Sequence, residues 1–487
     1  MKLKDLLKGV KIKSNNIDLE TEIQGIASDS RRVENGYIFV AIKGLNLDGN
    51  SFIEDALKNG AGVIITDNEA NNGKNTIIVE NAREALAFLW NNYYNSPTKN
   101  IKIIAITGTN GKTSTAHFLY SIIKSAGYKC GLISTIKSFI NDEFFDTSNG
   151  SEIQGFSSAM TTPDPETLYR FFYEAEKHNV KYIVMEASSH ALALYKLAPI
   201  KFYIGAFTNL SAEHLDFHTD INDYFESKLK LFEHSENIVT NIDNEYGLQI
   251  GNIYKRAIKI STIGKADYYI NNLSFNEQGS CFDVLFNQDK IQIKTDVLGQ
   301  FTPENILISI ACANLLEISE QAIKNAILSC QAIKGRMEKI KENIYIDYAH
   351  TPLAMEKAIL SIKKHFPDKK IVVLFGCGGN RDKLKRKEMG KIASSLADKV
   401  ILTSDNCRNE SLEGIIGDIK TGITEQSHCK VINDRKKAII YTVKNLMNDE
   451  ILLLLGKGHE EYEISNNKKL PFSEKDIIFE ALYDKNS

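Results

Sequence analysis

Short apolar runs alternate with amphipathic stretches from the start of the chain. Residues 37–41 and 62–66 are apolar and rich in β-branched side chains, which predicts strands, and residues 51–58 between them have helical spacing. Another helix is expected near residues 82–94, after which a proline-containing turn ends the pattern. Residues 1–98 are therefore predicted to form a small α/β domain.

A second α/β region begins with the apolar run 101–106, which leads directly into a glycine-rich loop and a helix expected over residues 112–126. Further strands are predicted at 182–185 and 206–208. Strands that alternate with helices favour a mostly parallel sheet covered on both faces. We therefore expect a central domain over residues 99–331 with the architecture of a phosphate-loop ATPase.

The pattern changes again near residues 332–337. The strands predicted beyond this point are 344–346, 371–375, 400–402 and 451–455. A Rossmann-like α/β domain is therefore expected over residues 332–487. A chain of 487 residues exceeds what one core usually organises, which agrees with an α/β protein of three domains.

Bulk composition excludes several classes of protein. Charged residues make up 25% of the chain and nearly cancel at a net charge of -3, so no nucleic-acid or membrane partner is indicated. The longest apolar run, 451–455, is far shorter than the roughly 20 residues of a membrane span, and the lysine-rich start lacks the apolar core of a secretory signal. We expect a cytoplasmic monomer. The seven cysteines form no CxxC pair, so reduced thiols are expected.

The glycine-rich loop carries the first chemical signal. In the segment Thr107-Gly108-Thr109-Asn110-Gly111-Lys112-Thr113-Ser114, backbone N–H groups, the start of a helix and an ammonium group are expected around one small space, which suits a polyphosphate. Lys112 should reach the terminal phosphates, and Thr113 should direct its hydroxyl to magnesium. The residues predicted to bind ATP here are Gly108, Thr109, Asn110, Gly111, Lys112, Thr113 and Ser114. A tight turn with a surface lysine is the alternative, since Ile106 stands where the general motif has glycine.

Polar segments of distinctive composition are spread along the chain, and several of them directly follow predicted strands. They are Ser28-Asp29-Ser30-Arg31, Thr161-Thr162-Pro163-Asp164, Glu186-Ala187-Ser188-Ser189-His190, 208–218, 224–228, 297–305, 335–338, 347–352, 376–382, Asp405-Asn406-Cys407-Arg408 and Gly456-Lys457-Gly458-His459-Glu460. In this order, and together with the glycine loop, they resemble the Mur ligases of peptidoglycan synthesis over essentially the whole chain.

The resemblance implies an ATP- and magnesium-dependent ligase. Its expected reaction joins a diamino acid to UDP-N-acetylmuramoyl-L-alanyl-D-glutamate through an acyl phosphate, giving ADP and phosphate. Ser28 and Ser30 would hold the uridine diphosphate end. The residues implied for the muramoyl-peptide are Thr161, Thr162, Ser188 and Lys196, the last at a position where the family often has arginine. Without the other motifs, Ser28 to Arg31 could equally be a turn before a strand.

The resemblance also implies a catalytic set, which comprises Lys112, Glu186, His214 and Lys228. Glu186, His214 and Thr113 would hold magnesium ions, and Lys228 would join them as a carbamate formed with carbon dioxide. Taken alone, His214 would be a structural histidine, Glu186 a surface carboxylate and Lys228 a solvated lysine. Asn305, Arg336 and Asp347 are implied to contact the nucleotide, the last at the ribose.

The residues implied to bind the incoming amino acid are Arg381, Asp405, Asn406, Arg408, Gly456 and Glu460. The planar guanidinium of Arg408 can pair with the distal carboxylate of meso-diaminopimelate, whereas it would repel the distal ammonium of lysine. Cys407 replaces the family's proline, so lysine and lanthionine remain alternative substrates, and its thiol is expected to be an inert filler.

Two other functions remain open. A folylpolyglutamate synthetase-like ligase has a similar glycine loop, although the Ser28 to Arg31 and Asp405 to Arg408 segments count against it. A nucleotide-switch binding protein could use the same loop without making a product. Detection of a new amide bond distinguishes either ligase from the switch.

Overall fold

The computed structural model describes residues 1–44, 47–147, 161–211, 213, 217–424, 428–465 and 468–485. The chain divides into two compact units, the first formed mainly by residues 1–260 and the second mainly by residues 261–487. Both units alternate strands and helices, and the fold class predicted from the sequence is confirmed.

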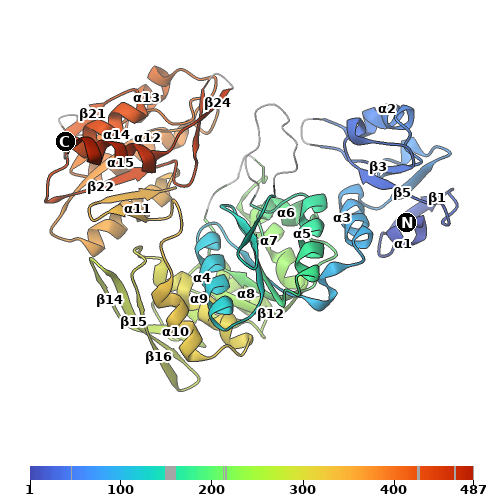
Figure 1. Ribbon diagram of the computed structural model, residues 1–487, viewed down its shortest axis with the longest axis horizontal. Coiled ribbons are helices and arrows are strands. Elements are labelled where there is room, and N and C mark those ends of the chain that lie inside the picture. The colour runs from blue at the N-terminus through green and yellow to red at the C-terminus, as the bar shows by residue number, and fades with distance from the viewer. Residues whose placement is uncertain are drawn as a thin grey trace. The chain divides into compact units, whose positions relative to one another are not determined.

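The first unit begins with a five-stranded sheet in the order β1, β5, β4, β3, β2, drawn in blue in Figure 1. Strand β1 is antiparallel to β5, and the other pairs are parallel. The elements are β1 (Ile12–Asn15), β2 (Gly25–Ala27), β3 (Tyr37–Ala41), β4 (Val63–Thr66), β5 (Thr76–Val79), α1 (Leu3–Leu6), α2 (Ile53–Lys58), α3 (Ala82–Tyr93), and the 3-10 helices η1 (Ser30–Arg32), η2 (Gly49–Phe52), η3 (Glu69–Asn71) and η4 (Pro97–Asn100). The side chain of Asn81 caps α3, so this helix begins where the sequence predicted.

The second sheet of this unit is centred on β6. Strands β13, β12, β11, β6, β10 and β7 lie parallel in that order, and β8 and β9 add antiparallel strands beyond β7. The elements are β6 (Lys102–Thr107), β7 (Cys130–Ile133), β8 (Ser138–Ile140), β9 (Glu143–Phe145), β10 (Tyr182–Glu186), β11 (Phe202–Phe207), β12 (Ser235–Asn241), β13 (Ile258–Ser261), α4 (Lys112–Ser125), α5 (Pro165–Lys177), α6 (Ser189–Ala193), α7 (Ile221–Glu233) and α8 (Glu245–Ile253). All of β6 except Lys102 is buried, as expected for a strand covered on both faces.

The register of this sheet brings the predicted polar segments together. Ile106 in β6 lies opposite Glu186 in β10 on one side and Ala206 in β11 on the other. The glycine loop, the Glu186 segment and the stretch after β11 therefore leave the sheet side by side. This edge is where parallel α/β sheets bind ligands.

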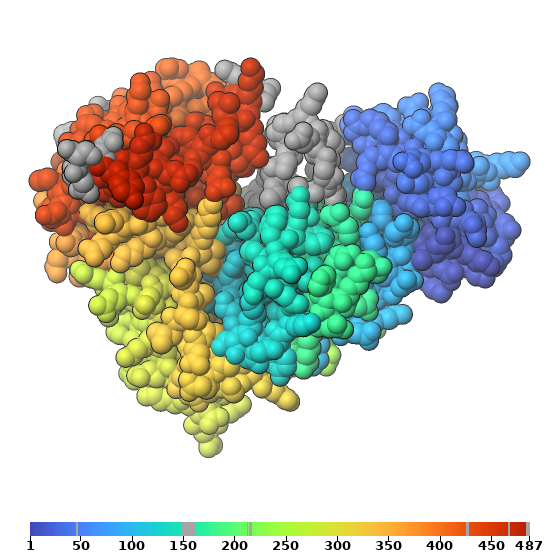
Figure 2. All heavy atoms as spheres, viewed as in Figure 1, coloured from blue at the N-terminus to red at the C-terminus, as the bar shows by residue number. Residues whose placement is uncertain are grey.

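The second unit starts with an antiparallel meander that the sequence had not predicted. It consists of β14 (Tyr268–Asn276), β15 (Gly279–Phe286) and β16 (Asp289–Thr295), followed by α9 (Thr302–Leu315) and α10 (Glu320–Ser329). In β16, buried residues alternate with exposed ones, because one face packs against α10. The yellow-green spheres of these strands narrow to a tip in Figure 2.

The C-terminal sheet has the order β17, β18, β22, β19, β20, β21, and only its β17–β18 pair is antiparallel. The elements are β17 (Glu338–Lys341), β18 (Ile344–Asp347), β19 (Lys370–Phe375), β20 (Lys399–Leu402), β21 (Cys429–Val431), β22 (Glu450–Leu455), the hairpin β23 (Tyr462–Ser465) and β24 (Lys468–Pro471), α11 (Pro352–His365), α12 (Leu384–Leu396), α13 (Leu412–Lys420), α14 (Arg435–Lys444) and α15 (Glu474–Lys485). Helices α11 to α13 pack on one face of the sheet, and α14 and α15 pack on the other. The four strands predicted here are confirmed.

A buried ion pair joins α14 to α15. The guanidinium of Arg435 donates to Glu474 at 2.8 Å. It also donates to the carbonyls of Ser404, which follows β20, and Leu455, which ends β22, at 3.0 and 2.9 Å. All seven cysteines are free. Within the described residues, none of the helices combines the length and the apolar character needed to cross a bilayer.

Candidate active site

The glycine loop is held by the polar stretch after β11. The N–H of Thr109 donates to the carbonyl of Asn209 at 2.8 Å, and the Thr208 hydroxyl donates to the carbonyl of Asn110 at 2.6 Å. Gly108 has a φ of +148°, and a Cβ there would lie 1.9 Å from the Thr208 hydroxyl oxygen. Only glycine fits such a close approach. Thr208 and Asn209 were not predicted as site residues, although their place directly after a strand was a signal.

Two ammonium groups meet at one carbonyl of this loop. Lys112 Nζ donates to the carbonyls of Gly108 and Thr109 at 2.9 and 2.8 Å. Lys228, on α7, is 1% exposed and donates to the same Gly108 carbonyl at 3.0 Å, above the ring of Tyr224. Burial, and then the neighbouring charge of Lys112, lowers the pKa of Lys228 well below its usual value. The surface lysine that was the alternative for Lys228 is therefore excluded.

Glu186 is fully buried at the end of β10 and accepts hydrogen bonds from two threonines. Its Oε2 atom accepts from the Thr113 hydroxyl at 3.1 Å, and its Oε1 atom accepts from the backbone N–H of Thr135 at 2.8 Å. The Thr135 hydroxyl lies 3.1 Å from both Glu186 Oε2 and the Thr161 hydroxyl. Thr135 follows β7 in a segment without a recognisable motif, so it could not be predicted as a site residue.

Thr162 and Ser188 lie together beside this carboxylate. The Thr162 hydroxyl donates to the Glu186 carbonyl at 2.9 Å and accepts from the Ser188 N–H at 3.1 Å. Lys196 forms an ion pair with Asp164 at 2.6 Å. The predicted muramoyl-peptide residues thus lie after the carboxyl end of β10 and around the start of α5.

The Ser28–Ser30 segment belongs to the N-terminal domain and is anchored to α5. Ser28 is exposed, and Ser30 opens the 3-10 helix η1. Arg32, in the same short helix, pairs in a bidentate manner with Glu166 on α5 at 2.8 and 2.9 Å. This pair links the predicted uridine diphosphate segment to the helix that follows Thr162.

A histidine that the sequence reading left unassigned connects two site segments. His218 is 2% exposed, with Nε2 3.0 Å from the Ser189 hydroxyl and Nδ1 3.2 Å from a carboxylate oxygen of Asp223. It joins the segment after β10 to α7, which carries Lys228. His214, predicted as a metal ligand, lies outside the described residues.

The reaction that the resemblance implies requires magnesium, and the side chains around Glu186 offer oxygen ligands of the kind that this ion prefers. No group of three metal-binding His, Cys, Asp or Glu side chains occurs in the described part of the chain. The Thr113 hydroxyl and the Glu186 carboxylate supply two of the oxygen ligands that magnesium prefers, and water or phosphate oxygens commonly complete its octahedron. These residues fit the ion, and a carbamate on Lys228 would add oxygen donors.

Three predicted nucleotide residues lie in the second unit. Asn305 is buried in the first turn of α9. Asp347 ends β18 and accepts from the N–H groups of Met337 and Ala349 at 2.7 and 2.9 Å, and burial raises its pKa against the influence of Arg336. The guanidinium of Arg336 lies 4.8 Å from the ring centre of Tyr348.

Three strand-end loops of the C-terminal sheet converge, because β22, β19 and β20 are parallel neighbours. Lys457, fully buried, donates to Asn406 Oδ1 at 3.3 Å and lies 3.6 Å from Asp405. Asn406 in turn donates to Glu460 Oε2 at 2.8 Å. A Cβ on Gly456 would lie 2.8 Å from Asp405 Oδ2. Asp405, Asn406, Gly456 and Glu460 are thus brought together as predicted, and Lys457 is an additional residue of the cluster.

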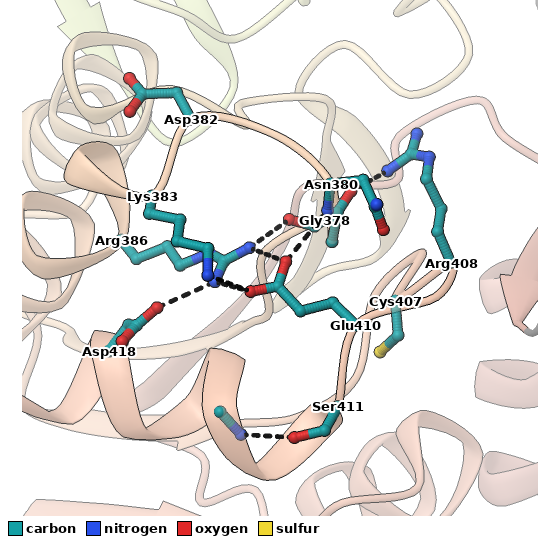
Figure 3. A network of polar contacts seen from close by, with 12 residues as sticks. Gly378, Asn380, Asp382, Lys383, Arg386, Cys407, Arg408, Glu410, Ser411 and Asp418 are labelled. Atoms are coloured by element: carbon teal, nitrogen blue, oxygen red, sulfur yellow. Dashed lines mark hydrogen bonds and ion pairs between the residues drawn. The ribbon is translucent and has the colours of Figure 1, made fainter.

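Arg381 and Arg408 lie close enough to affect each other electrostatically. Burial, followed by the charge of Arg381, lowers the pKa of Arg408. Arg408 reaches across to the neighbouring loop and donates to the Gly379 carbonyl at 2.9 Å (Figure 3). Within the described residues, no carboxylate forms an ion pair with either guanidinium. Two neighbouring cations of this kind can hold a carboxylate ligand.

Comparison with known proteins agrees with this geometry. Residues 22–94 match the catalytic domain of the Mur ligase family, residues 106–313 the Mur ligase middle domain, and residues 335–458 the glutamate ligase domain of Mur ligases. UDP-N-acetylmuramoyl-L-alanyl-D-glutamate--2,6-diaminopimelate ligases of Caldanaerobacter subterraneus and Aquifex aeolicus are 39% and 38% identical, over 99% and 94% of both chains.

Comparison with solved structures indicates the same family. One described as UDP-N-acetylmuramoyl-L-alanyl-D-glutamate--2,6-diaminopimelate ligase is 28% identical, covers 100% of this chain and 99% of its own, and has a TM-score of 0.72. A folylpolyglutamate synthase of Mycobacterium tuberculosis, at 14% identity over 77% of this chain and 92% of its own, with a TM-score of 0.62, shares the fold alone. The resemblance inferred from the motifs and the three-domain architecture are confirmed, and the chain belongs to the Mur ligase family.

Proposed function

We propose that the protein is an ATP-dependent ligase that joins 2,6-diaminopimelate to UDP-N-acetylmuramoyl-L-alanyl-D-glutamate in peptidoglycan precursor synthesis. The meso isomer is the expected amino acid, and the products are the tripeptide, ADP and phosphate. The observation that carries the choice of amino acid is the pair Arg381 and Arg408, beside Glu460. Two cations and one carboxylate complement an amino acid with two carboxylates and an ammonium group.

The chemical steps follow from the glycine loop. The γ-phosphoryl group of ATP passes to the free carboxylate of the dipeptide, and the amine of the diamino acid then attacks the acyl phosphate and displaces phosphate. Lys112 Nζ exchanges its bonds to the Gly108 and Thr109 carbonyls for bonds to the terminal phosphates. Thr113 and Glu186 would hold magnesium, which neutralises charge on the transferring group when bound. Ser114 and the loop N–H groups that do not donate to Asn209 would bind the remaining phosphate oxygens.

Lys228 is proposed to act as a carbamate. Its buried position lowers its pKa, which favours the neutral amine that reacts with carbon dioxide. The product would present oxygen atoms in place of an ammonium group, next to the Gly108 carbonyl. His214 is kept as a proposed magnesium ligand on the strength of the family resemblance.

The large acceptor substrate would extend from the N-terminal domain to the sheet edge. Ser28 and Ser30 are proposed to bind its uridine diphosphate end, and Thr161, Thr162, Ser188 and Lys196 its muramoyl-peptide. Asn305, Arg336 and Asp347 are proposed to contact the nucleotide. We also propose the domain limits 1–98, 99–331 and 332–487, a cytoplasmic location and a monomeric state.

The identity of the diamino acid depends on the charges in the C-terminal pocket. In our proposal Arg408 pairs with the distal carboxylate, Arg381 with the other one, and Glu460 with an ammonium group. Asp405, Asn406 and Gly456 would line the base of this pocket. Burial, and then Asp405, raises the pKa of Glu460. Lanthionine also carries two carboxylates and would be accepted, whereas lysine would place an ammonium group against a guanidinium.

A direct assay tests the proposal. Purified protein is incubated with ATP, magnesium, UDP-N-acetylmuramoyl-L-alanyl-D-glutamate and, separately, diaminopimelate, lanthionine or lysine. Mass spectrometry should detect the amide product with diaminopimelate, together with equimolar phosphate. Absence of both products would overturn the proposal. Hydrolysis of ATP without an amide would favour the nucleotide switch, and addition of glutamate to a folate would favour the folylpolyglutamate reaction.

A further inference from the structure

The two loops that carry Arg381 and Arg408 are fastened to each other. The N–H of Gly379 donates to the Asn406 carbonyl at 2.9 Å, and Arg408 donates back to the Gly379 carbonyl at the same distance. Their backbones are so close that a Cβ on Gly379 would lie 1.9 Å from the Cys407 carbonyl oxygen. The two loops therefore behave as one surface, and the position of each arginine depends on the other loop.

An ion pair centred on a buried arginine connects the two loops (Figure 3). Arg386, in the first turn of α12, is fully buried and binds both carboxylate oxygens of Glu410 at 2.7 and 2.8 Å. The same guanidinium donates to Asp418 on α13 at 2.9 Å and to the Gly378 carbonyl at 3.2 Å. Arg386 thus contacts a carbonyl of one loop and the carboxylate of the other.

Glu410 completes the link through the backbone. Its Oε2 atom accepts the N–H of Asn380 at 3.0 Å, directly before Arg381, and Glu410 itself follows Arg408 by two residues. Asn380 and Arg408 both have a φ of +54°, a strained region for residues other than glycine. Such conformations persist only where the surroundings enforce them, and the bonds of Glu410 provide that constraint.

We propose that Arg386 and Glu410 are positioning residues that set the spacing of the Arg381 and Arg408 guanidinium groups, and thereby the preference for an amino acid with two carboxylates. Neither residue needs to touch the substrate. This inference rests on the proposed function, and it assigns to the ion pair a role in selectivity in addition to its role in stability.

The test compares Glu410→Gln with a matched control, Glu450→Gln. Like Glu410, Glu450 accepts a backbone N–H and a cation, but it is more deeply buried and lies at the start of β22, at the end opposite the loops. KM and kcat are measured for diaminopimelate, lysine, ATP and the UDP-muramoyl-dipeptide. Glu410→Gln should raise the diaminopimelate KM about tenfold or more, as expected for a displaced binding group.

The pattern across substrates is decisive. The KM values for ATP and the dipeptide should stay within about twofold in Glu410→Gln, and the ratio of kcat/KM for diaminopimelate over lysine should fall about tenfold. Asp418→Asn, which weakens only the outer contact of Arg386, should show the same pattern more weakly. Glu450→Gln should leave the selectivity ratio unchanged.

Two results would overturn the inference. One is a Glu410→Gln variant with unchanged selectivity, and the other is an equal loss of selectivity in Glu450→Gln. If Glu410→Gln does not fold, Glu410→Asp, which keeps the charge and shortens the side chain, takes its place with the same expectation. A wild-type protein that makes no amide at all refutes the proposed function instead, and this result is seen before any variant is compared.

Discussion

The edge of the β6 sheet and the edge of the β22 sheet use different means to prepare a binding site. At the first edge, Lys112 and Lys228 bond to a backbone carbonyl, and hydroxyl groups surround the carboxylate of Glu186. At the second edge, cations and carboxylates are paired beneath the surface, as in Arg386 with Glu410. A polyphosphate requires cations that can turn toward it, whereas a small zwitterion requires charges at fixed spacing.

The largest effect is expected from Gly108→Ala, because the first edge depends on close backbone approach. The new Cβ would meet the Thr208 hydroxyl at 1.9 Å in a backbone conformation with φ +148°. Ligase activity should fall about 100-fold or more, since the loop N–H groups and Lys112 are displaced.

Gly127→Ala is the matched control for this change. Gly127 follows the same helix α4 and also has a positive φ, of +83°. Apart from its own chain neighbours, the described part of the chain places no atom within 4 Å of the new Cβ. Its substitution should lower the free energy of unfolding by about 1 kcal/mol and leave kcat unchanged. An equal loss of activity in both variants, measured by phosphate release, would show that strain and not the clash is responsible.

The second edge is tested most directly by Arg408→Ala. The diaminopimelate KM should rise about 10- to 100-fold, while the ATP KM stays within about twofold, because a desolvated charge-assisted pair is lost. Arg256→Ala is the control, since Arg256 likewise donates to a backbone carbonyl, that of Ser235. A similar rise in both KM values of the Arg408 variant would contradict its assigned role.

Glu410→Gln is expected to have a smaller effect, namely a loss of stability that depends on pH. Arg386 holds the pKa of Glu410 well below its usual value of 4.5, so the charged carboxylate stabilises the folded state. The free energy of unfolding should drop by about 1.5 kcal/mol at pH 7 in the variant, because Glu410 is only partly buried. This difference should be complete above about pH 4.5 and shrink as the pH falls below it, because the wild type then loses the contribution.

Urea unfolding at pH 7, 5 and 4 measures this difference. Glu320→Gln, which removes an exposed pair with Lys324 on α10, should change stability by no more than about 0.5 kcal/mol at each pH. A difference for Glu410→Gln that grew on acidification would be incompatible with a stabilising carboxylate.

The smallest effect is expected from Cys407→Pro. This change restores the residue that the family usually has and stiffens the loop between Asn406 and Arg408. It should raise the free energy of unfolding by about 0.5 kcal/mol through the unfolded chain. Selectivity for diaminopimelate should remain within about twofold of the wild type, since other contacts already fasten the loop. A large gain in selectivity would show that the cysteine leaves the loop loose.

Prediction from the sequence worked where one strand leads directly to one functional segment. The run 101–106 and its glycine loop fixed β6, α4 and the site of Lys112, and the apolar runs of the C-terminal region gave β18, β19, β20 and β22. The meander β14–β16 was missed, because its alternating polar residues resemble loop composition over short windows.

Residues that act by holding other residues in place could not be predicted from the sequence. Thr135 approaches Glu186 from the end of β7, and Arg386 on α12 meets Glu410 in the loop before α13. Each contact depends on tertiary packing that no local pattern records. Lys457 belongs to the segment Gly456 to Glu460, which was recognised from the sequence. Its complete burial beside Asn406 could not be inferred, since lysine is seldom fully buried.

The position of β22 has a consequence for hydrogen exchange. All six of its residues are buried, and β18 and β19 flank it on both sides in register. Its amide protons should exchange with solvent only when the C-terminal sheet unfolds as a whole, whereas those of the outward hairpin β23–β24 should exchange through local opening. The slowest-exchanging backbone of this region should therefore end directly at Gly456, which would place the proposed pocket next to the most stable part of its sheet.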